Sequence, residues 1–506
     1  MLLVRADKEV KMRFISTRDT KGDSYVSAAY AIKQGLAPDG GLYVPESIPQ
    51  IDENYVTSFL GMSYPEMAAE ILSLFLDDFT KEELLEYARA AYINNVFPES
   101  VAPLSEVTDQ VSVLELWHGP TAAFKDFALS IMPRLLTASL RKLGETRTVL
   151  ILVATSGDTG KAALEGYRDV DGVKIKVFYP VDGVSKVQKL QMATQLGANV
   201  DVCAIRGNFD DAQTGVKKIF SDPEIASELN ARGYLLSSAN SINWGRLAPQ
   251  IVYYFSAYCE LIRRGRIKYG DKIDFCVPTG NFGNILAGYI AKKMGLPIGK
   301  LICASNANNI LTDFLNSGVY DRNRKFHTTM SPSMDILISS NLERLLYFVA
   351  GSGTVVNCMK SLSDTGAYTI DRDILAEINE DFCGYYADEN ATNDTIANIY
   401  DNYNYLCDPH TAVGMYCAEK YTENASSDSR IVLLSTASPF KFAASVYTAL
   451  TKCMAPEGYE ALSALSDLAS LPISTPLAGL DKRNVRFDRV CEPEEMASDM
   501  FEHLDD

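Results

Sequence analysis

Short apolar runs alternate with helical patterns through the middle of the chain. The runs at 149–154, 175–180 and 198–205 have the length and apolar content of buried strands. Helical patterns over 161–168 and 185–196 separate them. Such an alternation is typical of parallel strands joined by helical crossovers. This segment therefore predicts an α/β unit built on a parallel sheet.

A second series of the same kind follows. Strand-like runs lie at 273–278, 301–305 and 430–436, with a helical pattern over 284–294 after the first. A long helical stretch over 246–263 separates this series from the earlier one. Two series of strands and helices predict two α/β lobes, each with its own sheet.

The two ends of the chain differ from this middle part. A turn-rich piece at 37–49 precedes helical patterns such as 63–76, whereas the residues beyond 452 have weak periodicity. A chain of 506 residues is also too long for a single compact core. We therefore expect four parts: an N-terminal, mostly helical domain (1–110), a large α/β domain (111–145 with 246–452), a smaller inserted α/β domain (146–245) and a C-terminal tail without assigned chemistry (453–506).

We expect that the first residues are not a signal peptide. Charged residues are spread over residues 1–12, and these residues lack the apolar central segment (h-region) of a signal peptide. Met12 is an alternative start, which predicts that residues 1–11 are dispensable and poorly ordered.

Composition excludes several classes of function. The net charge of −18 argues against nucleic-acid binding, which requires a basic face, but it leaves room for a small anionic substrate. No apolar run reaches the ~18 residues that a membrane span needs. The ten cysteines show no C-x-x-C spacing and the four histidines no H-x-x-x-H spacing. We expect a cytoplasmic protein with reduced cysteines and no metal site.

Three polar turns lie where a strand is expected to end and a helix to begin. They are TGNFGN (279–284), ATSGDTG (154–160) and SSANSINWGR (237–246). Backbone N–H groups and the helix dipole favour anions at such positions. Each turn taken alone is also compatible with ordinary turn chemistry, including a helix start capped by Asp158 or Thr159.

Two nucleotide-binding templates fail on these turns. A dinucleotide fingerprint would need glycine where Phe282 and Ile285 stand. A Walker A loop, which would indicate an ATP-binding NTPase, fails at Thr155 and Ala162. The NTPase alternative is therefore disfavoured.

Lys125 lies in an otherwise apolar stretch, between Phe124 and Phe127. Apolar surroundings lower the pKa of a lysine and make the neutral, nucleophilic amine accessible. The competing interpretation is a surface lysine whose stem passes along the aromatic rings.

Taken together and in order, the motifs resemble those of the threonine synthase family, a member of the tryptophan-synthase-β-like group of fold type II pyridoxal-phosphate (PLP) enzymes. The resemblance runs from residue 12 to about 447. It implies two parallel-sheet lobes with an N-terminal, mostly helical extra domain. The segments that carry it are FISTRD (14–19), GLAPDGGLYVP (35–45), HGPTAAFKD (118–126), ATSGDTG, SSANSINWGR, TGNFGN, DPHTAVG (408–414) and LSTASPFKF (434–442).

The resemblance implies roles for named residues. Lys125 would bind PLP covalently and later move protons, and Thr436 would contact the pyridine nitrogen of the cofactor. His410 either faces the site or supports it from behind. The cofactor phosphate would be held by Gly280, Asn281, Phe282, Gly283 and Asn284. The amino-acid end of the substrate would lie at Ser156, Gly157, Asp158 and Thr159. The substrate phosphate would be bound by Asn240, Ser241, Asn243 and Arg246, together with Lys189.

The resemblance also implies a reaction. The substrate would be O-phospho-L-homoserine, which loses phosphate and gains water to give L-threonine. A phospho-lyase of the same fold, which stops after elimination and releases 2-oxobutyrate and ammonia, stays open as an alternative, as does a binding protein without cofactor. We expect a monomer or homodimer that binds neither nucleic acid nor membrane.

Overall fold

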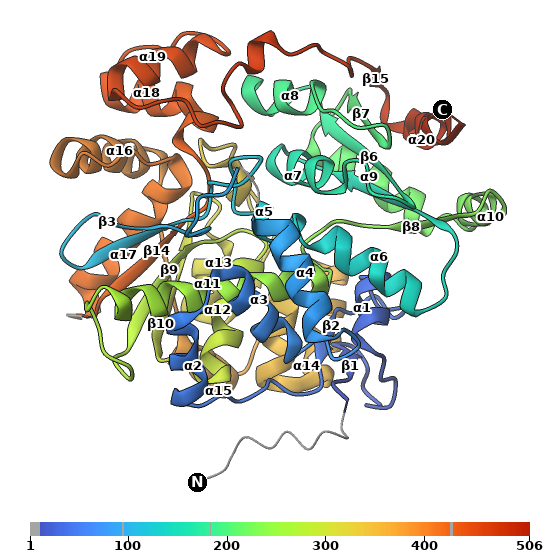
Figure 1. Ribbon diagram of the computed structural model, residues 1–506, viewed down its shortest axis with the longest axis horizontal. Helices are drawn as coiled ribbons and strands as arrows, with labels where there is room; N and C mark the ends of the chain where they lie inside the picture. Colours follow the sequence, from blue (N-terminus) through green and yellow to red (C-terminus); the bar gives the residue numbers. More distant parts are fainter. Residues whose placement is uncertain (1–10, 94–95, 183, 426–428, 506) are drawn as a thin grey trace.

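Two parallel β-sheets form the centre of the computed structural model (Figure 1). The structure describes residues 11–93, 96–182, 184–425 and 429–505. Residues 1–10, which make up most of the segment predicted to be poorly ordered, lie outside this range. Among the described residues, no helix has both the length and the apolar character needed to cross a membrane.

The larger sheet has six strands in the order β13-β10-β9-β14-β4-β3. All neighbours run parallel except β3, which pairs antiparallel with β4. Every residue of β9 and β14 is buried, as the continuous apolar runs predict for strands covered on both faces. The strands are β3 (Leu104–Glu106), β4 (Val111–Glu115), β9 (Ile273–Pro278), β10 (Ile298–Ser305), β13 (Phe382–Tyr386) and β14 (Ile431–Ser435).

Helices cover both faces of this sheet. One of them, α17, contacts β9, β10 and β14, and α13 contacts β10 and β13. The helices of this lobe are α12 (Gly283–Met294), α13 (Ile310–Ser317), α14 (Leu342–Thr365), α15 (Arg372–Asp381), α16 (Glu389–Tyr403), α17 (Pro409–Ala425) and α18 (Ala443–Thr451). A small antiparallel pair, β11 (Val319–Asp321) and β12 (Ala367–Thr369), lies beside them.

The smaller sheet has five parallel strands in the order β15-β7-β6-β5-β8. Its strands are β5 (Thr148–Ala154), β6 (Val173–Pro180), β7 (Val200–Ile205), β8 (Tyr234–Ser237) and β15 (Val490–Cys491). Its helices are α7 (Asp158–Tyr167), α8 (Lys186–Ala193), α9 (Phe209–Ser221) and α10 (Pro223–Ala231). The predicted fold class, two parallel-sheet lobes, is confirmed.

The N-terminal part is mostly helical, as expected. It packs on α11 (Trp244–Arg263), a helix buried along most of its length that also contacts α12 of the large lobe. Burial on most of its sides is expected for a helix in such a central position. The helices and strands of the chain before β5, apart from β3 and β4, are β1 (Phe14–Ser16), α1 (Ala28–Gln34), β2 (Tyr43–Pro45), α2 (Glu53–Ser58), α3 (Tyr64–Ser73), α4 (Lys81–Tyr92), α5 (Asp126–Leu129) and α6 (Met132–Lys142).

The residues beyond 452 complete the small lobe. In Figure 1 this segment runs from α19 (Glu460–Ala469), beside α18, across α8 to β15 and α20 (Met496–Asp505). There β15 adds an edge strand to β7, and Asp499 of α20 pairs with Lys176 of β6. A strand of two residues leaves too short a pattern in a sequence to be predicted.

Candidate active site

The predicted site segments all follow the carboxyl end of a parallel strand. Lys125 comes after β4, Asp158 after β5, Arg246 after β8, Gly280 after β9 and Thr436 directly after β14. Ligands of open α/β sheets bind at this edge because the loops and helix N-termini gather there. The structure therefore brings loops from both sheets toward one place.

Lys125 is held in a tight turn just before α5. The backbone N–H of Phe124 donates to the carbonyl of Thr436, and Ala123 pairs with Ala437 in an isolated bridge. The lysine loop is thus fixed to the end of β14. Only 11% of the Lys125 side chain is exposed. Burial lowers the pKa of its amine to about 8, although the nearby Asp158 carboxylate opposes the change.

Asp158 is the first residue of α7, and its side chain does not cap the helix. Instead Thr155 Oγ1 accepts hydrogen bonds from the N–H groups of Gly157 and Gly160. The carboxylate of Asp158 is therefore free to turn toward the large lobe. Neither Asp158 nor Thr159 is the helix cap considered in the sequence analysis, because Gly157 occupies that position.

Four donors surround the buried Asp158 carboxylate. Oδ1 lies 2.5 Å from Lys441 Nζ and 2.8 Å from Gln188 Nε2, while Oδ2 lies 3.4 Å from Ser333 Oγ and 3.8 Å from Lys125 Nζ. Burial alone would raise its pKa, but the two lysines and the hydrogen bonds outweigh burial and hold the pKa below its ordinary value. The site thus contains an ionised carboxylate close to the reactive amine.

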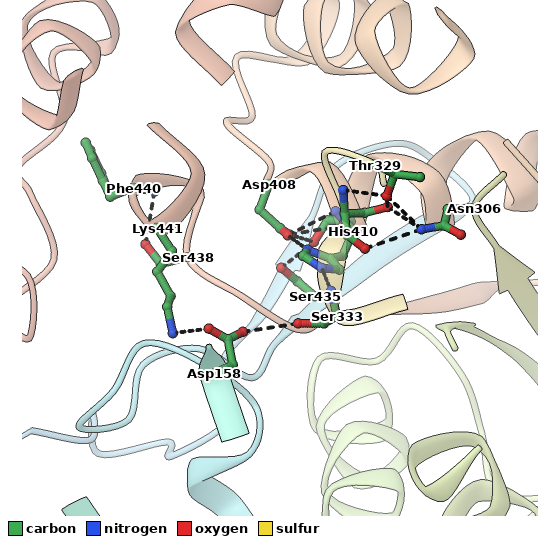
Figure 2. Close-up of polar contacts among 12 residues, drawn as sticks. Asp158, Asn306, Thr329, Ser333, Asp408, His410, Ser435, Ser438, Phe440 and Lys441 are labelled. Carbon is green, nitrogen blue, oxygen red and sulfur yellow. Dashed lines mark hydrogen bonds and ion pairs between the residues drawn. The ribbon is translucent and has the colours of Figure 1, made fainter. Parts of the chain in front are cut away.

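Figure 2 shows Lys441 and Ser333 reaching Asp158 from two sides. Lys441 lies in a short 3-10 helix (Pro439–Phe442) after β14, and its side chain is completely buried. No role for Lys441 was predicted from the sequence. A signal was present, since Lys441 stands between Phe440 and Phe442 in an apolar segment, as Lys125 does near Phe124 and Phe127.

His410 supports the site from behind Ser333. Its Nε2 accepts the backbone N–H of Ser333 at 3.2 Å, and its Nδ1 lies 2.6 Å from a carboxylate oxygen of Asp408 (Figure 2). With Nε2 as acceptor, Nδ1 carries the proton that is shared with Asp408. The second of the two alternatives for His410, a supporting position, is the one observed.

The Gly280–Asn284 turn has the features of an anion site. Phe282 adopts the left-handed φ of 64°, and no side chain caps α12. The carbonyls of Gly280 and Asn281 accept hydrogen bonds from Ser339 and Asn341. Within the described ranges, the backbone N–H groups of this turn meet no acceptor outside their own helix. These donors remain available to a phosphate.

Asn284 adds a further donor to this turn. Its Oδ1 accepts from the Tyr253 hydroxyl at 2.5 Å, which directs Nδ2 away as a buried amide without a partner among the described residues. A buried donor left unpaired is costly unless a ligand satisfies it. The residues present therefore fit a phosphorylated aldehyde cofactor: an amine at Lys125 and an anion-binding turn at the end of β9.

Arg246 is a buried cation without a carboxylate partner. It lies in the first turn of α11, donates from one terminal nitrogen to the Ala239 carbonyl at 2.6 Å, and leaves Nε unpaired. In the described part of the chain, no acidic side chain forms an ion pair with it. Burial lowers its pKa to about 10. Such a guanidinium is suited to a phosphate ligand.

The other residues predicted to bind the substrate phosphate differ in their burial and in whether their side chains already have hydrogen-bond partners. Asn240 and Ser241 lie half-buried in the turn before α11. Asn243 is the N-cap of α11, accepting from Gly245 N–H and donating to the Ile32 carbonyl, so its side chain is already occupied. Lys189 is exposed and lines a separate apolar pocket of about 300 Å³ together with Tyr459 and Phe487.

Ser156 and Thr159 lie half-buried on either side of Gly157. Gly157 has a φ of 135°, and an added Cβ would lie 2.6 Å from the Gln188 amide. Glycine is therefore required for the turn to bring Asp158 and Gln188 together.

Among the residues that the structure describes, no group of three or more His, Cys, Asp or Glu side chains could hold a metal ion.

Three family profiles match consecutive parts of the chain. "Threonine synthase N terminus" matches residues 13–92, "Pyridoxal-phosphate dependent enzyme" matches 102–437, and "Threonine synthase, C-terminal" matches 411–496. The matched parts include every loop described above.

Individual proteins are similar over most of their length. Threonine synthase of Pseudomonas aeruginosa is 40% identical over 437 residues, which cover 85% of this chain and 89% of that protein. Human "threonine synthase-like 1" is 38% identical over 86% of this chain, which spans only 60% of that longer relative. The crystal structure of PLP-bound threonine synthase from Brucella melitensis has a TM-score of 0.85 and 37% identity, covering 97% of this chain and 99% of that one.

Proposed function

This chain belongs to the threonine synthase family of pyridoxal-phosphate-dependent enzymes, and we propose that it converts O-phospho-L-homoserine and water to L-threonine and phosphate. The observation that supports the proposal best is that the site contains both a buried amine and a buried guanidinium without a carboxylate partner among the described residues. Lys125 suits the cofactor and substrate carbon chemistry, and Arg246 suits the phosphate that leaves.

The bound cofactor supplies a conjugated ring that spreads negative charge from the substrate carbons. In our proposal Lys125 holds it through the side-chain amine, and Gly280, Asn281, Phe282, Gly283 and Asn284 hold its phosphate. Thr436 would offer the ring nitrogen a neutral hydroxyl, which would leave that nitrogen less protonated than a carboxylate partner would.

Lys125 also moves protons between the α, β and γ carbons of the substrate. An amine whose pKa is about 8 serves this purpose near neutral pH, because it can both accept and donate a proton. The Asp158 carboxylate, 3.8 Å from Nζ, stabilises the protonated form while the proton is carried. Ser156, Gly157 and Thr159 of the same turn bind the amino-acid end of the substrate.

Arg246 binds the phosphate group of the substrate and stabilises the dianion as the bond to Cγ breaks. A fixed guanidinium in a buried site needs no reorganisation at that moment. Asn240 and Ser241, in the turn that precedes α11, add hydrogen-bond donors. Water addition at Cβ then completes L-threonine.

Proteins of two names, threonine synthase and threonine synthase-like 1, are nearly equally similar to this chain, at 40% and 38% identity. The name of the second group states no reaction, and a second candidate activity on the same residues is elimination without hydration, which would give 2-oxobutyrate, ammonia and phosphate. The two activities differ only in where water attacks.

A single incubation distinguishes the two activities. Purified holoenzyme is mixed with O-phospho-L-homoserine, and threonine, 2-oxobutyrate and free phosphate are quantified over time. We expect threonine to match phosphate one to one, with unphosphorylated homoserine as an inert control. Phosphate accompanied by 2-oxobutyrate in place of threonine would establish the phospho-lyase, and the absence of phosphate release would refute both.

A further inference from the structure

A second buried lysine lies next to the site, and the proposed function gives it no task. The Lys441 side chain is completely buried, and its Nζ lies 2.5 Å from Asp158 Oδ1. The same ammonium donates to the carbonyl of Thr121 at 3.0 Å, in the loop that carries Lys125. Lys441 is therefore fixed between the two loops rather than free to reach a substrate.

The three charges are arranged unequally. Asp158 is the one carboxylate that forms ion pairs with both lysines among the described residues, at 2.5 Å to Lys441 and 3.8 Å to Lys125. Coulomb attraction rises as distance falls, so the ion pair with Lys441 is the stronger of the two. When two ammonium groups share one carboxylate, the carboxylate balances the charge of the more distant ammonium, that of Lys125, only in part.

We propose that Lys441 is a positioning residue. Its ammonium holds the Asp158 carboxylate in an ion pair, which weakens the attraction between that carboxylate and Lys125 and so keeps the Lys125 amine neutral and free to bind the cofactor aldehyde. The inference rests on the proposed role of Lys125 but does not depend on the identity of the substrate.

Other groups also act on the Lys125 amine, and they remain in place when Lys441 is changed. Burial is the largest influence and lowers its pKa, as do the positive charges of Lys441 and Arg246, whereas the carboxylates of Asp158 and Asp126 raise it. Asp126 is held by the N–H and the hydroxyl of Thr121. Replacing Lys441 by an uncharged side chain thus removes one lowering influence and strengthens the hold of Asp158 on Lys125.

The test follows cofactor uptake by the full-length apoprotein. Pyridoxal phosphate is added at a series of pH values and the rate of appearance of the yellow chromophore is recorded. Only the neutral amine reacts, so the rate should rise through a midpoint near the Lys125 pKa, about 8 in the wild type. For Lys441→Met we expect the midpoint to move upward by about one pH unit or more.

Two variants separate charge from structure. Lys441→Arg keeps the positive charge and should restore a midpoint close to the wild-type value. Lys360→Met, which removes an exposed lysine paired with Asp364 on α14, should leave the midpoint unchanged. A wild-type midpoint in Lys441→Met, or an equal shift in the Met and Arg variants, would overturn the proposal.

Asp158→Asn provides an independent measurement of opposite sign, which keeps the proposal falsifiable if the Met variant is recovered unfolded. Removing the carboxylate takes away the influence that raises the Lys125 pKa, so the midpoint should fall below that of the wild type. An unchanged or higher midpoint would contradict the inference. Because these readings need no substrate, they stand even if the enzyme releases no threonine.

Discussion

Nζ of Lys125 lies 3.8 Å from Oδ2 of Asp158, although the two residues follow strands of different sheets. Lys125 follows β4 of the larger sheet and Asp158 follows β5 of the smaller one. The reactive amine and its nearest carboxylate thus meet only where the lobes meet. A change in the angle between the lobes would alter their distance and hence the basicity of the amine.

Lys125→Ala should abolish threonine formation, with a loss on the order of a thousandfold or more, because both the attachment of the cofactor and the proton transfers depend on one amine. The purified variant should lack the yellow chromophore yet keep the wild-type circular dichroism spectrum. Borohydride reduction of the wild type, followed by peptide mapping, should place the adduct on Lys125. An adduct on another lysine would remove Lys125 from its role.

Arg246→Ala should raise the KM for O-phospho-L-homoserine by about 10- to 100-fold, because the phosphate loses a buried, charge-assisted partner. Inhibition by inorganic phosphate should weaken in parallel. Arg263→Ala, at the exposed end of the same helix, serves as the matched control and should change neither value. An unchanged KM in Arg246→Ala would mean that another group holds the phosphate.

The strands and the lysine loop could be predicted because their signals are local. The continuous apolar runs correspond to β5, β6, β7, β9, β10 and β14 within a few residues. Short strands such as β3, β13 and β15 were missed because two to five residues are too few to show a pattern that distinguishes a strand from a loop. Their pairing is set by neighbours far away in the sequence.

The site could be predicted in outline but not in its pairings. Asn243 and Arg246 look equally suited to phosphate in the sequence, yet the structure uses Asn243 to cap a helix and leaves Arg246 without a counter-ion. A helix cap and a ligand donor require the same side-chain chemistry, so sequence cannot separate them. The pairing of Asp158 with Lys441 is likewise a tertiary contact between different lobes.

Lys176→Met should destabilise the small lobe by about 3 kcal/mol or more, because it leaves two buried carboxylates with the more exposed Arg489 as their remaining cationic partner among the described residues. Lys176 is fully buried on β6 and pairs with Asp201 of β7 and Asp499 of α20. Urea unfolding followed by circular dichroism would measure the loss. Lys186→Met, which removes an exposed pair with Glu457, is the control and should change stability little. A loss of less than about 1 kcal/mol in Lys176→Met would show that the ion pairs of Lys176 with the two carboxylates contribute little to the free energy of unfolding.

His503, on α20 next to this network, should make stability depend on pH. Burial lowers the pKa of its imidazole from 6.5 to about 4, and the positive charges of Lys176, Lys174 and Arg489 act in the same direction against Asp201. Between these two values the unfolded chain binds a proton that the folded chain does not. The free energy of unfolding should therefore fall as pH decreases from 6.5 toward 4, by roughly 3 kcal/mol from this group.

The contribution of His503 can be isolated with His503→Gln, which cannot titrate. Urea unfolding of both proteins at several pH values gives two curves, and their difference cancels the carboxylates that titrate in the same range. We expect that difference to be constant above pH 6.5 and to grow in favour of the variant as pH falls toward 4, because the wild type alone must keep an imidazole neutral against protonation. Parallel curves over the whole range would show that the imidazole has the same pKa in the folded and unfolded chains.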